Sequence, residues 1–162
     1  MKLQNFTYGH INVGNIKKIK MKKIIFISLL IISYSCSTYT IPTESFKTQF
    51  SNFDSIQKRE RVINNPMTYG TIKYMTNNIM MINAIDKNNN PLTIRNSASL
   101  EMRVTKKNGK KNVFYFDTVT LENDTLKGSQ SRFLPKLRKE IPFNDIIKIE
   151  IQDGGKNYNY QN

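Results

Sequence analysis

The spacing of apolar residues divides the chain into an apolar N-terminal segment, one helical stretch and a long series of short strands. In the helical stretch, which begins at Thr43, Phe46, Phe50 and Phe53 recur at the three- and four-residue intervals of one helix face. Thr43 can cap this helix, and the pattern runs on as far as Pro66. An aromatic stripe of this kind is typical of core packing, so we expect the helix to cover the core.

After residue 66 the helical period gives way to short alternating runs separated by turn residues. The clearest run is 99–105, which alternates apolar and polar positions and leads into Asn108 and Gly109, a pair typical of tight hairpin turns. The segments that read as strands are 68–75, 79–86, 92–94, 99–105, 112–121, 125–129, 140–143, 146–152 and 156–161.

This pattern predicts a mainly β fold. Frequent turns and the lack of a helical period after residue 66 favour an antiparallel small barrel or sandwich, SH3-like or Sm-like, with one N-terminal helix. A chain of 162 residues has room for one domain with its own core. A single cysteine permits no internal disulfide, so packing and hydrogen bonds must stabilise the fold.

The apolar N-terminal segment reads as a signal rather than as part of the fold. Lys22 and Lys23 precede the apolar run 24–32, which is only about half the roughly twenty residues that a membrane-spanning helix needs. Small and polar residues then lead to Cys36, the only cysteine. The expected organisation is an upstream extension at 1–20, a signal peptide at 21–35, a tether at 36–43 and a single mainly β domain at 44–162.

The order of positive end, apolar core, small residues and Cys36 resembles a bacterial lipoprotein signal. The resemblance implies that the Cys36 thiol carries a diacylglyceryl group and that Cys36 is the first residue of the mature chain. Ser35 suits the position before the cut, whereas Ser33 stands where Leu is usual and Tyr34 is bulkier than the motif prefers. Several acyl chains would anchor the protein stably. The competing interpretation is an incidental cysteine in an ordinary cleaved signal or a short anchor.

The rest of the chain also resembles lipoproteins. Over roughly residues 70–160, the stretches 103–133 and 141–154 are similar to short uncharacterised lipoproteins of Gram-negative bacteria. This resemblance implies a family without a settled activity. The resemblance implies a lipid-anchored protein of the bacterial cell envelope, at the outer membrane. In lipoproteins of this general type an acidic run after the cysteine can direct display on the cell surface. No acidic run follows Cys36, so we expect the protein to face the periplasm.

Charge adds two candidate anion-binding clusters. The net charge is +13, but six lysines lie in the first 35 residues with no acid among them, so the remainder is only moderately basic. An AT-rich coding sequence would also enrich lysine without any functional reason. The clusters are Lys106, Lys107, Lys110 and Lys111 at the predicted hairpin tip, followed by Lys136, Arg138 and Lys139. On an exported protein, the anions that these clusters could bind are lipid headgroups of an anionic membrane and cell-wall polymers. The favoured interpretation is nevertheless a solvated hairpin tip.

The residue inventory disfavours catalysis. His10 is the only histidine and lies in the predicted extension, and acylation of Cys36 would leave no free thiol. The usual general base, thiol nucleophile and soft metal ligands would then be missing. Ser129 and Ser131 lack a histidine partner. We therefore expect no enzyme activity, no catalytic residue, no metal site and no cofactor.

Asp117 is the one acidic residue whose position is informative. In the alternating run 113–119 it shares a face with Val113 and Tyr115. If that face points inward, Asp117 is buried and needs a partner, for which Arg132 is a candidate. If the opposite face points inward, Asp117 is solvated, and this second interpretation is the favoured one.

Three functions remain open. The leading one is a lipid-anchored, periplasm-facing module that binds a protein or cell-wall partner. The second is an inhibitor or immunity-type lipoprotein that acts on a protein partner. The third is a nucleic-acid binder, since small barrels bind nucleic acids through basic surfaces. It requires that the chain is not exported, and with export we expect no nucleic-acid partner.

Overall fold

The computed structural model describes residues 37–161 apart from 52–57 and 135–136. The chain divides into two units, residues 1–35 and residues 36–162, and all the described residues belong to the second. The predicted extension, the predicted signal peptide and Cys36 itself lie outside the described residues.

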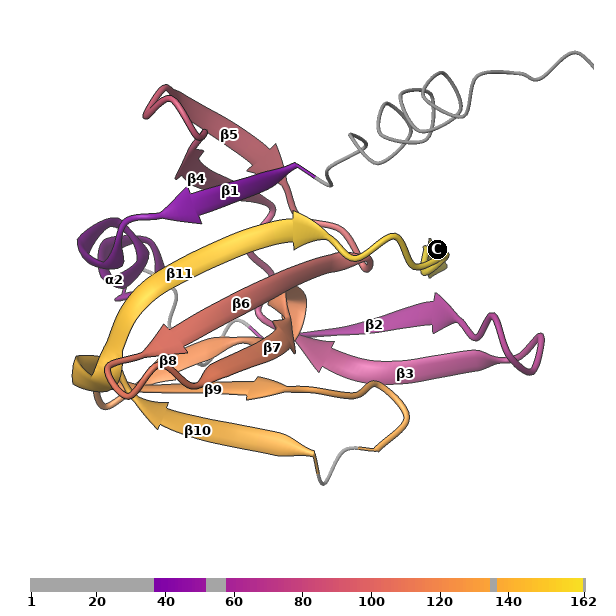
Figure 1. The fold of residues 1–162 in the computed structure, drawn as a ribbon. Coiled ribbons are helices and arrows are strands. Elements are labelled where there is room, and N and C mark those ends of the chain that lie inside the picture. Colours follow the sequence, from indigo (N-terminus) through magenta and orange to yellow (C-terminus); the bar gives the residue numbers. More distant parts are fainter. Residues whose placement is uncertain (1–36, 52–57, 135–136, 162) are drawn as a thin grey trace, which may run out of the picture. The chain divides into compact units, whose positions relative to one another are not determined.

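The described part of the chain is mainly β, as predicted, with a single α-helix near its start (Figure 1). The helix is α2 (Thr43–Ser51), and two short 3-10 helices are η2 (Phe116–Thr118) and η3 (Phe143–Asp145). The strands are β1 (Thr38–Ile41), β2 (Arg59–Asn64), β3 (Thr71–Thr76), β4 (Met81–Ile85), β5 (Pro91–Arg95), β6 (Leu100–Lys106), β7 (Lys111–Tyr115), β8 (Thr120–Glu122), β9 (Thr125–Ser129), β10 (Arg138–Pro142), β11 (Ile146–Asp153) and β12 (Tyr160–Gln161).

The strands form three antiparallel sheets. The largest has the order β5-β4-β1-β11-β6-β7, and the two smaller ones have the orders β10-β9-β8 and β12-β2-β3. Each order has two open ends, so none of the sheets built from the described strands closes on itself. The antiparallel arrangement is confirmed, while a closed barrel or a two-layer sandwich stays a prediction.

The predicted tether at 36–43 is wrong for most of its length. Strand β1 lies inside the six-stranded sheet between β4 and β11, where Ile41 pairs with Ile149 and Thr40 pairs with Ile85. The sequence TYTI consists of β-branched and aromatic residues, which suit a pleated, half-buried strand. Four residues are too few for such a strand to be recognised in the sequence.

Helix α2 begins at Thr43 as predicted and packs its aromatic face into the core. Phe46 and Phe50 are both buried, with their ring centroids 4.1 Å apart. Phe46 also stacks on Phe143 at 5.8 Å, and Phe50 meets the edge of Phe116 at 5.9 Å. The prediction that these side chains form core is confirmed, and Phe53 lies outside the described residues.

The predicted helix is wrong at its C-terminal end. Residues 59–64 form strand β2, which pairs with β3 from Arg59 opposite Thr76 to Asn64 opposite Thr71. Ile63 is fully buried in this strand. The polar residues at the start of β2 fit a helix surface as well as an exposed strand, so the local pattern did not separate the two.

The predicted hairpin at Asn108 and Gly109 is confirmed. It joins β6 to β7, and the amide of Gly109 donates to the carbonyl of Lys106 at 2.9 Å. Of the two turn residues, only Gly109 takes a positive φ, at 77°. The return strand ends at Tyr115 rather than at residue 121, because the 3-10 helix η2 interrupts it.

Two groups of buried apolar side chains form the core. The main group joins α2 to the six-stranded sheet and to β9 and β10, and it includes Phe46, Phe114, Leu126 and Ile149. A smaller group consists of Ile63, Ala98, Tyr115 and Tyr158, with Ile72, Tyr74 and Tyr160 packed against it. This smaller tyrosine-rich group surrounds the candidate site.

Close packing at Gly128 in β9 gives a first prediction. A Cβ atom there would lie 2.8 Å from Phe114 Cδ1 and 3.2 Å from Val119 Cγ2, both in the core. We expect Gly128→Ala to lower the free energy of unfolding by about 1–3 kcal/mol through overpacking, measured by urea denaturation. Gly70→Ala is the control, since its Cβ would meet only Thr68 Oγ1 at 3.5 Å. Equal midpoints for the two variants would contradict the packing described.

Candidate functional site

The 3-10 helix η2 decides the position of Asp117. In a regular strand Phe116 and Asp117 would point to opposite faces, but in this turn both are fully buried, with 0% of each residue exposed. The favoured expectation of a solvated Asp117 is therefore wrong, and the alternative of a buried carboxylate is the one found. The expectation of a solvated Asp117 rested on a regular strand alternation, which the 3-10 helix η2 interrupts.

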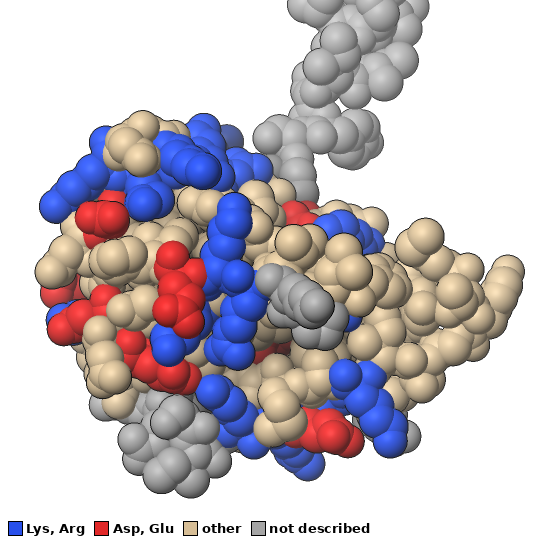
Figure 2. All heavy atoms as spheres, turned by 90° about the horizontal axis from the view of Figure 1, so that it is seen from below, with Lys and Arg blue, Asp and Glu red and all other residues tan. Residues whose placement is uncertain are grey.

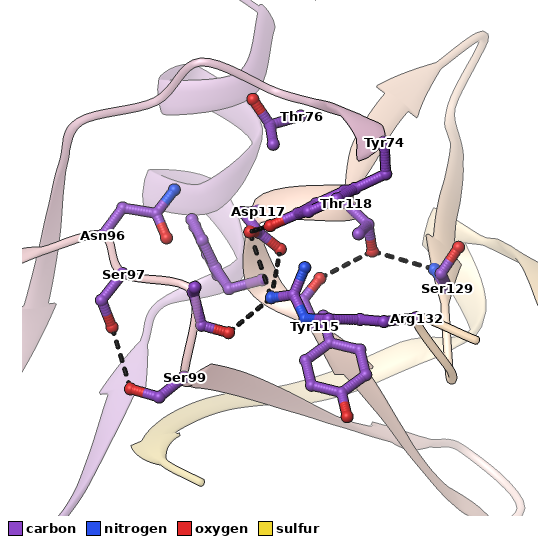
Figure 3. Close-up of polar contacts among 12 residues, drawn as sticks. Tyr74, Thr76, Asn96, Ser97, Ser99, Tyr115, Asp117, Thr118, Ser129 and Arg132 are labelled. Carbon is purple, nitrogen blue, oxygen red and sulfur yellow. Dashed lines mark hydrogen bonds and ion pairs between the residues drawn. The ribbon is translucent and has the colours of Figure 1, made fainter. Parts of the chain in front are cut away.

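The buried carboxylate is paired with the predicted candidate, Arg132. The Nη2 atom of Arg132 lies 3.0 Å from Asp117 Oδ1 and 3.1 Å from Oδ2, and neither side chain is exposed (Figure 3). The same Nη2 donates to the carbonyl of Ala98 at 2.5 Å. Arg132 thus links the turn η2 to the loop that precedes β6.

Two tyrosine hydroxyls complete the surroundings of the carboxylate. Tyr74 on β3 donates to Asp117 Oδ2 at 2.5 Å, and Tyr160 on β12 donates to the same oxygen at 2.8 Å. A buried charge is tolerated only when it is paired and hydrogen-bonded. Asp117 meets both conditions, and its partners come from the last strand, from β3 and from the segment after β9.

Aromatic rings enclose the guanidinium of Arg132. The Cζ atom lies 4.2 Å from the ring centroid of Tyr115, 4.6 Å from that of Tyr74 and 5.3 Å from that of Tyr158. Each ring face attracts the positive charge. The Nε and Nη1 atoms are buried and have no hydrogen-bond partner among the described residues.

This arrangement fixes charge rather than moving protons. The pKa values of the Tyr74 and Tyr160 hydroxyls are raised, first by burial and then by the negative charge of Asp117. Both hydroxyls therefore stay protonated donors and are poor nucleophiles. Since Asp117 accepts from Arg132 and from both tyrosines, the described geometry suits a rigid structural centre.

The raised tyrosine pKa values predict a pH dependence of stability. Above about pH 10, the ordinary pKa of tyrosine, the unfolded chain releases phenol protons that the folded chain keeps, so the free energy of unfolding should fall as pH rises. Urea denaturation at a series of pH values around and above pH 10 should show a shallower fall in the free energy of unfolding for the double variant Tyr74→Phe/Tyr160→Phe. Tyr69→Phe is the control, because Tyr69 is fully exposed, and it should keep the wild-type slope.

A cavity of about 400 Å³ opens beside Arg132. It lies among β3, the segment from η2 to β8, the end of β9 and the start of β10. Among the described residues its lining includes four cations and no acidic residue. The lining residues are Lys58, Lys73, Tyr74, Met75, Thr76, Asn77, Thr118, Thr120, Ser129, Ser131, Arg132 and Arg138.

A second cavity, of about 440 Å³, lies on the side of Tyr158 and Tyr160. Arg61 and Arg95 contribute its positive charge. The side-chain oxygen of Asn96 is buried there without a hydrogen-bond partner in the described part of the chain. The tyrosines around Arg132 therefore contribute walls to both cavities.

The residues of the two predicted basic clusters make different contacts. At the hairpin tip, Lys106 lies 3.5 Å from Asp145, while Lys139 on β10 reaches Asn112 at 3.5 Å. Arg138 instead lines the cavity beside Arg132, and Lys136 lies outside the described residues. Seen from below, basic side chains gather in several groups with acidic side chains between them (Figure 2).

The described part of the chain lacks two features, a metal-binding cluster and a membrane-spanning helix. Within residues 37–51, 58–134 and 137–161, no group of three or more His, Cys, Asp or Glu side chains could hold a metal ion. The same part of the chain contains no helix long and apolar enough to cross a membrane.

Sequence reasoning missed several residues of the site. Tyr74, Lys58 and Lys73 were not singled out, because nothing in their local pattern links them to Arg132. A partial signal existed in the alternation that puts Tyr158 and Tyr160 on one face of the last segment, since both side chains lie at the Asp117 and Arg132 centre.

Comparison with known proteins gave no match: no protein-family model, no curated protein and no solved structure matches the chain.

Proposed function

We propose that the chain is a lipid-anchored binding module of the bacterial cell envelope, with acyl chains on Cys36 and a ligand cavity beside Arg132. Its place is the outer membrane, facing the periplasm. The boundary of the fold supports the anchor, because the compact unit starts at residue 36 and β1 begins at Thr38. Cleavage before Cys36 would remove none of the described strands.

The cavity carries the proposal that the domain binds rather than catalyses. Its volume of about 400 Å³ falls in the range of small-molecule sites, roughly 300–1,000 Å³. One of its lining residues is Arg132, whose position is fixed by Asp117 and by three tyrosine rings. A guanidinium held in this way keeps its N–H groups in fixed positions, so ligand binding would not have to order Arg132.

The sheet register gives the distance between the start of β1, where an anchor on Cys36 would hold the domain, and the basic hairpin tip. Thr38 pairs with Gln152, which pairs with Glu101, so β1 starts level with the start of β6. Lys106 lies five residues further along β6, or about 17 Å at the usual rise per residue. This distance exceeds the Debye length of about 8 Å in physiological salt. The hairpin tip would then add little to membrane attachment.

Metabolic labelling with a palmitate analogue tests the anchor in bacterial cells that make the full chain. We expect label and membrane association for the wild type, and loss of both for Cys36→Ala. Ser37→Ala is the matched control, because it changes the neighbouring residue and keeps the thiol. Label retained by the Cys36→Ala protein would show that the acyl chain is not on Cys36.

A further inference from the structure

We propose that the cavity beside Arg132 binds a phosphate monoester of a small polar molecule. This inference rests on the proposed role as a binding module and names its ligand class, and it does not require acylation of Cys36. Three properties of the lining support it: its unbalanced charge, its unpaired hydrogen-bond donors and its volume.

The charge of the lining matches a dianion. Arg132 is neutralised by Asp117, and Lys58 lies 3.0 Å from Glu122. Lys73 and Arg138 have no acidic partner among the described residues, so two positive charges remain. A phosphate monoester carries about −1.5 to −2 at pH 7 and would balance both. A single carboxylate would balance only one.

Hydrogen-bond donors in the lining lack acceptors. The Nε and Nη1 atoms of Arg132 and the hydroxyl of Thr120 are buried without partners in the described part of the chain. The Ser131 oxygen already accepts from the amides of Phe133 and Leu134, both at 3.2 Å, which leaves its hydrogen available to donate. Three phosphate oxygens would supply strong acceptors to such a donor set.

The volume leaves room for more than a free ion. A phosphate group would fill only a fraction of about 400 Å³, so the cavity can take a second, larger part of a ligand. The wall around that part is mixed, with Tyr74 and Met75 beside Thr76 and Ser129. A hydroxyl-rich body such as a sugar can pack on the ring and hydrogen-bond to the hydroxyls.

Isothermal titration of the purified full chain with glucose 6-phosphate, inorganic phosphate, glucose and glucuronate tests this ligand class. We expect the tightest binding for glucose 6-phosphate, weaker binding for phosphate and for glucuronate, and none for glucose. Lys73→Gln and Arg138→Gln should each weaken glucose 6-phosphate binding by about tenfold or more, because each removes a charged hydrogen-bond donor. Both side chains are exposed, so the urea midpoint should not change.

Lys87→Gln is the matched control, since this exposed lysine lies in the turn between β4 and β5 and does not line the cavity. Unchanged affinity in the Lys73 and Arg138 variants, or an equal loss in the Lys87 variant, would overturn the site. Glucuronate binding as tightly as glucose 6-phosphate would overturn the dianion class, and phosphate alone binding as tightly would overturn the larger ligand. Absent binding with palmitate label intact would overturn this inference and leave the anchor standing.

Discussion

Arg132→Met should lower the free energy of unfolding by about 3–5 kcal/mol, because it leaves the fully buried carboxylate of Asp117 without its cation. Methionine keeps most of the length and apolar stem of the side chain, so the change removes charge and hydrogen bonds more than volume. The bond from Arg132 Nη2 to the Ala98 carbonyl is lost as well. Urea denaturation at neutral pH measures the effect.

A double-mutant cycle separates the charge from the packing. Asp117→Asn removes the negative charge but keeps an oxygen that can accept from Tyr74 and Tyr160, so Arg132→Met combined with Asp117→Asn should recover much of the lost stability. The control is Lys47→Gln, which breaks the pair between Lys47 and Asp124, where both side chains are largely exposed. It should leave the midpoint unchanged. A midpoint for Arg132→Met equal to that of the control would contradict the buried pair.

The parts of the fold that sequence predicted correctly are those governed by local chemistry. Alternation identified the strand that became β6, and Asn108 with Gly109 identified its hairpin turn. Phenylalanines at helical spacing identified the start and the buried face of α2. Each of these signals is complete within about ten neighbouring residues, so no tertiary information was needed.

The candidate site was less predictable because it depends on long-range contacts. Tyr74 and Tyr160 each lie 43 residues from Asp117 in the chain, yet both donate to the same carboxylate oxygen. The partner Arg132 could be named as a candidate, but the burial of Asp117 follows from η2, which interrupts an alternation that looked regular.

The basic residues illustrate the same limit. Runs of lysine at the hairpin tip stand out in the sequence, but Lys106 and its neighbours lie at the end of a sheet where Asp145 offsets part of their charge. Lys73 and Arg138 are 65 positions apart and line one cavity, in which the described part of the chain places no acidic residue. Runs of basic residues in the sequence therefore did not identify the basic residues that line the cavity.

Ile41→Ala should lower the free energy of unfolding by about 2–5 kcal/mol, because the side chain is 1% exposed and belongs to the main core. This result distinguishes a strand from the tether that the sequence suggested, since truncating a side chain in a tether would change little. Ile147→Ala is the matched control, with the same chemical change at a side chain that is 56% exposed on β11. We expect it to stay within about 0.5 kcal/mol of the wild type in urea denaturation.

The position of β1 also determines how an acylated Cys36 would hold the domain. Only two residue steps separate Cys36 from Thr38, a span of at most about 7 Å. An anchored domain would therefore lie against the membrane surface, and unpairing β1 would lengthen the connection by the whole strand. In membranes carrying the acylated protein, Ile41→Ala should make the segment around residues 37–42 more sensitive to added protease than in the wild type or in Ile147→Ala. Equal cleavage of all three proteins would contradict the role of β1 in holding the domain close.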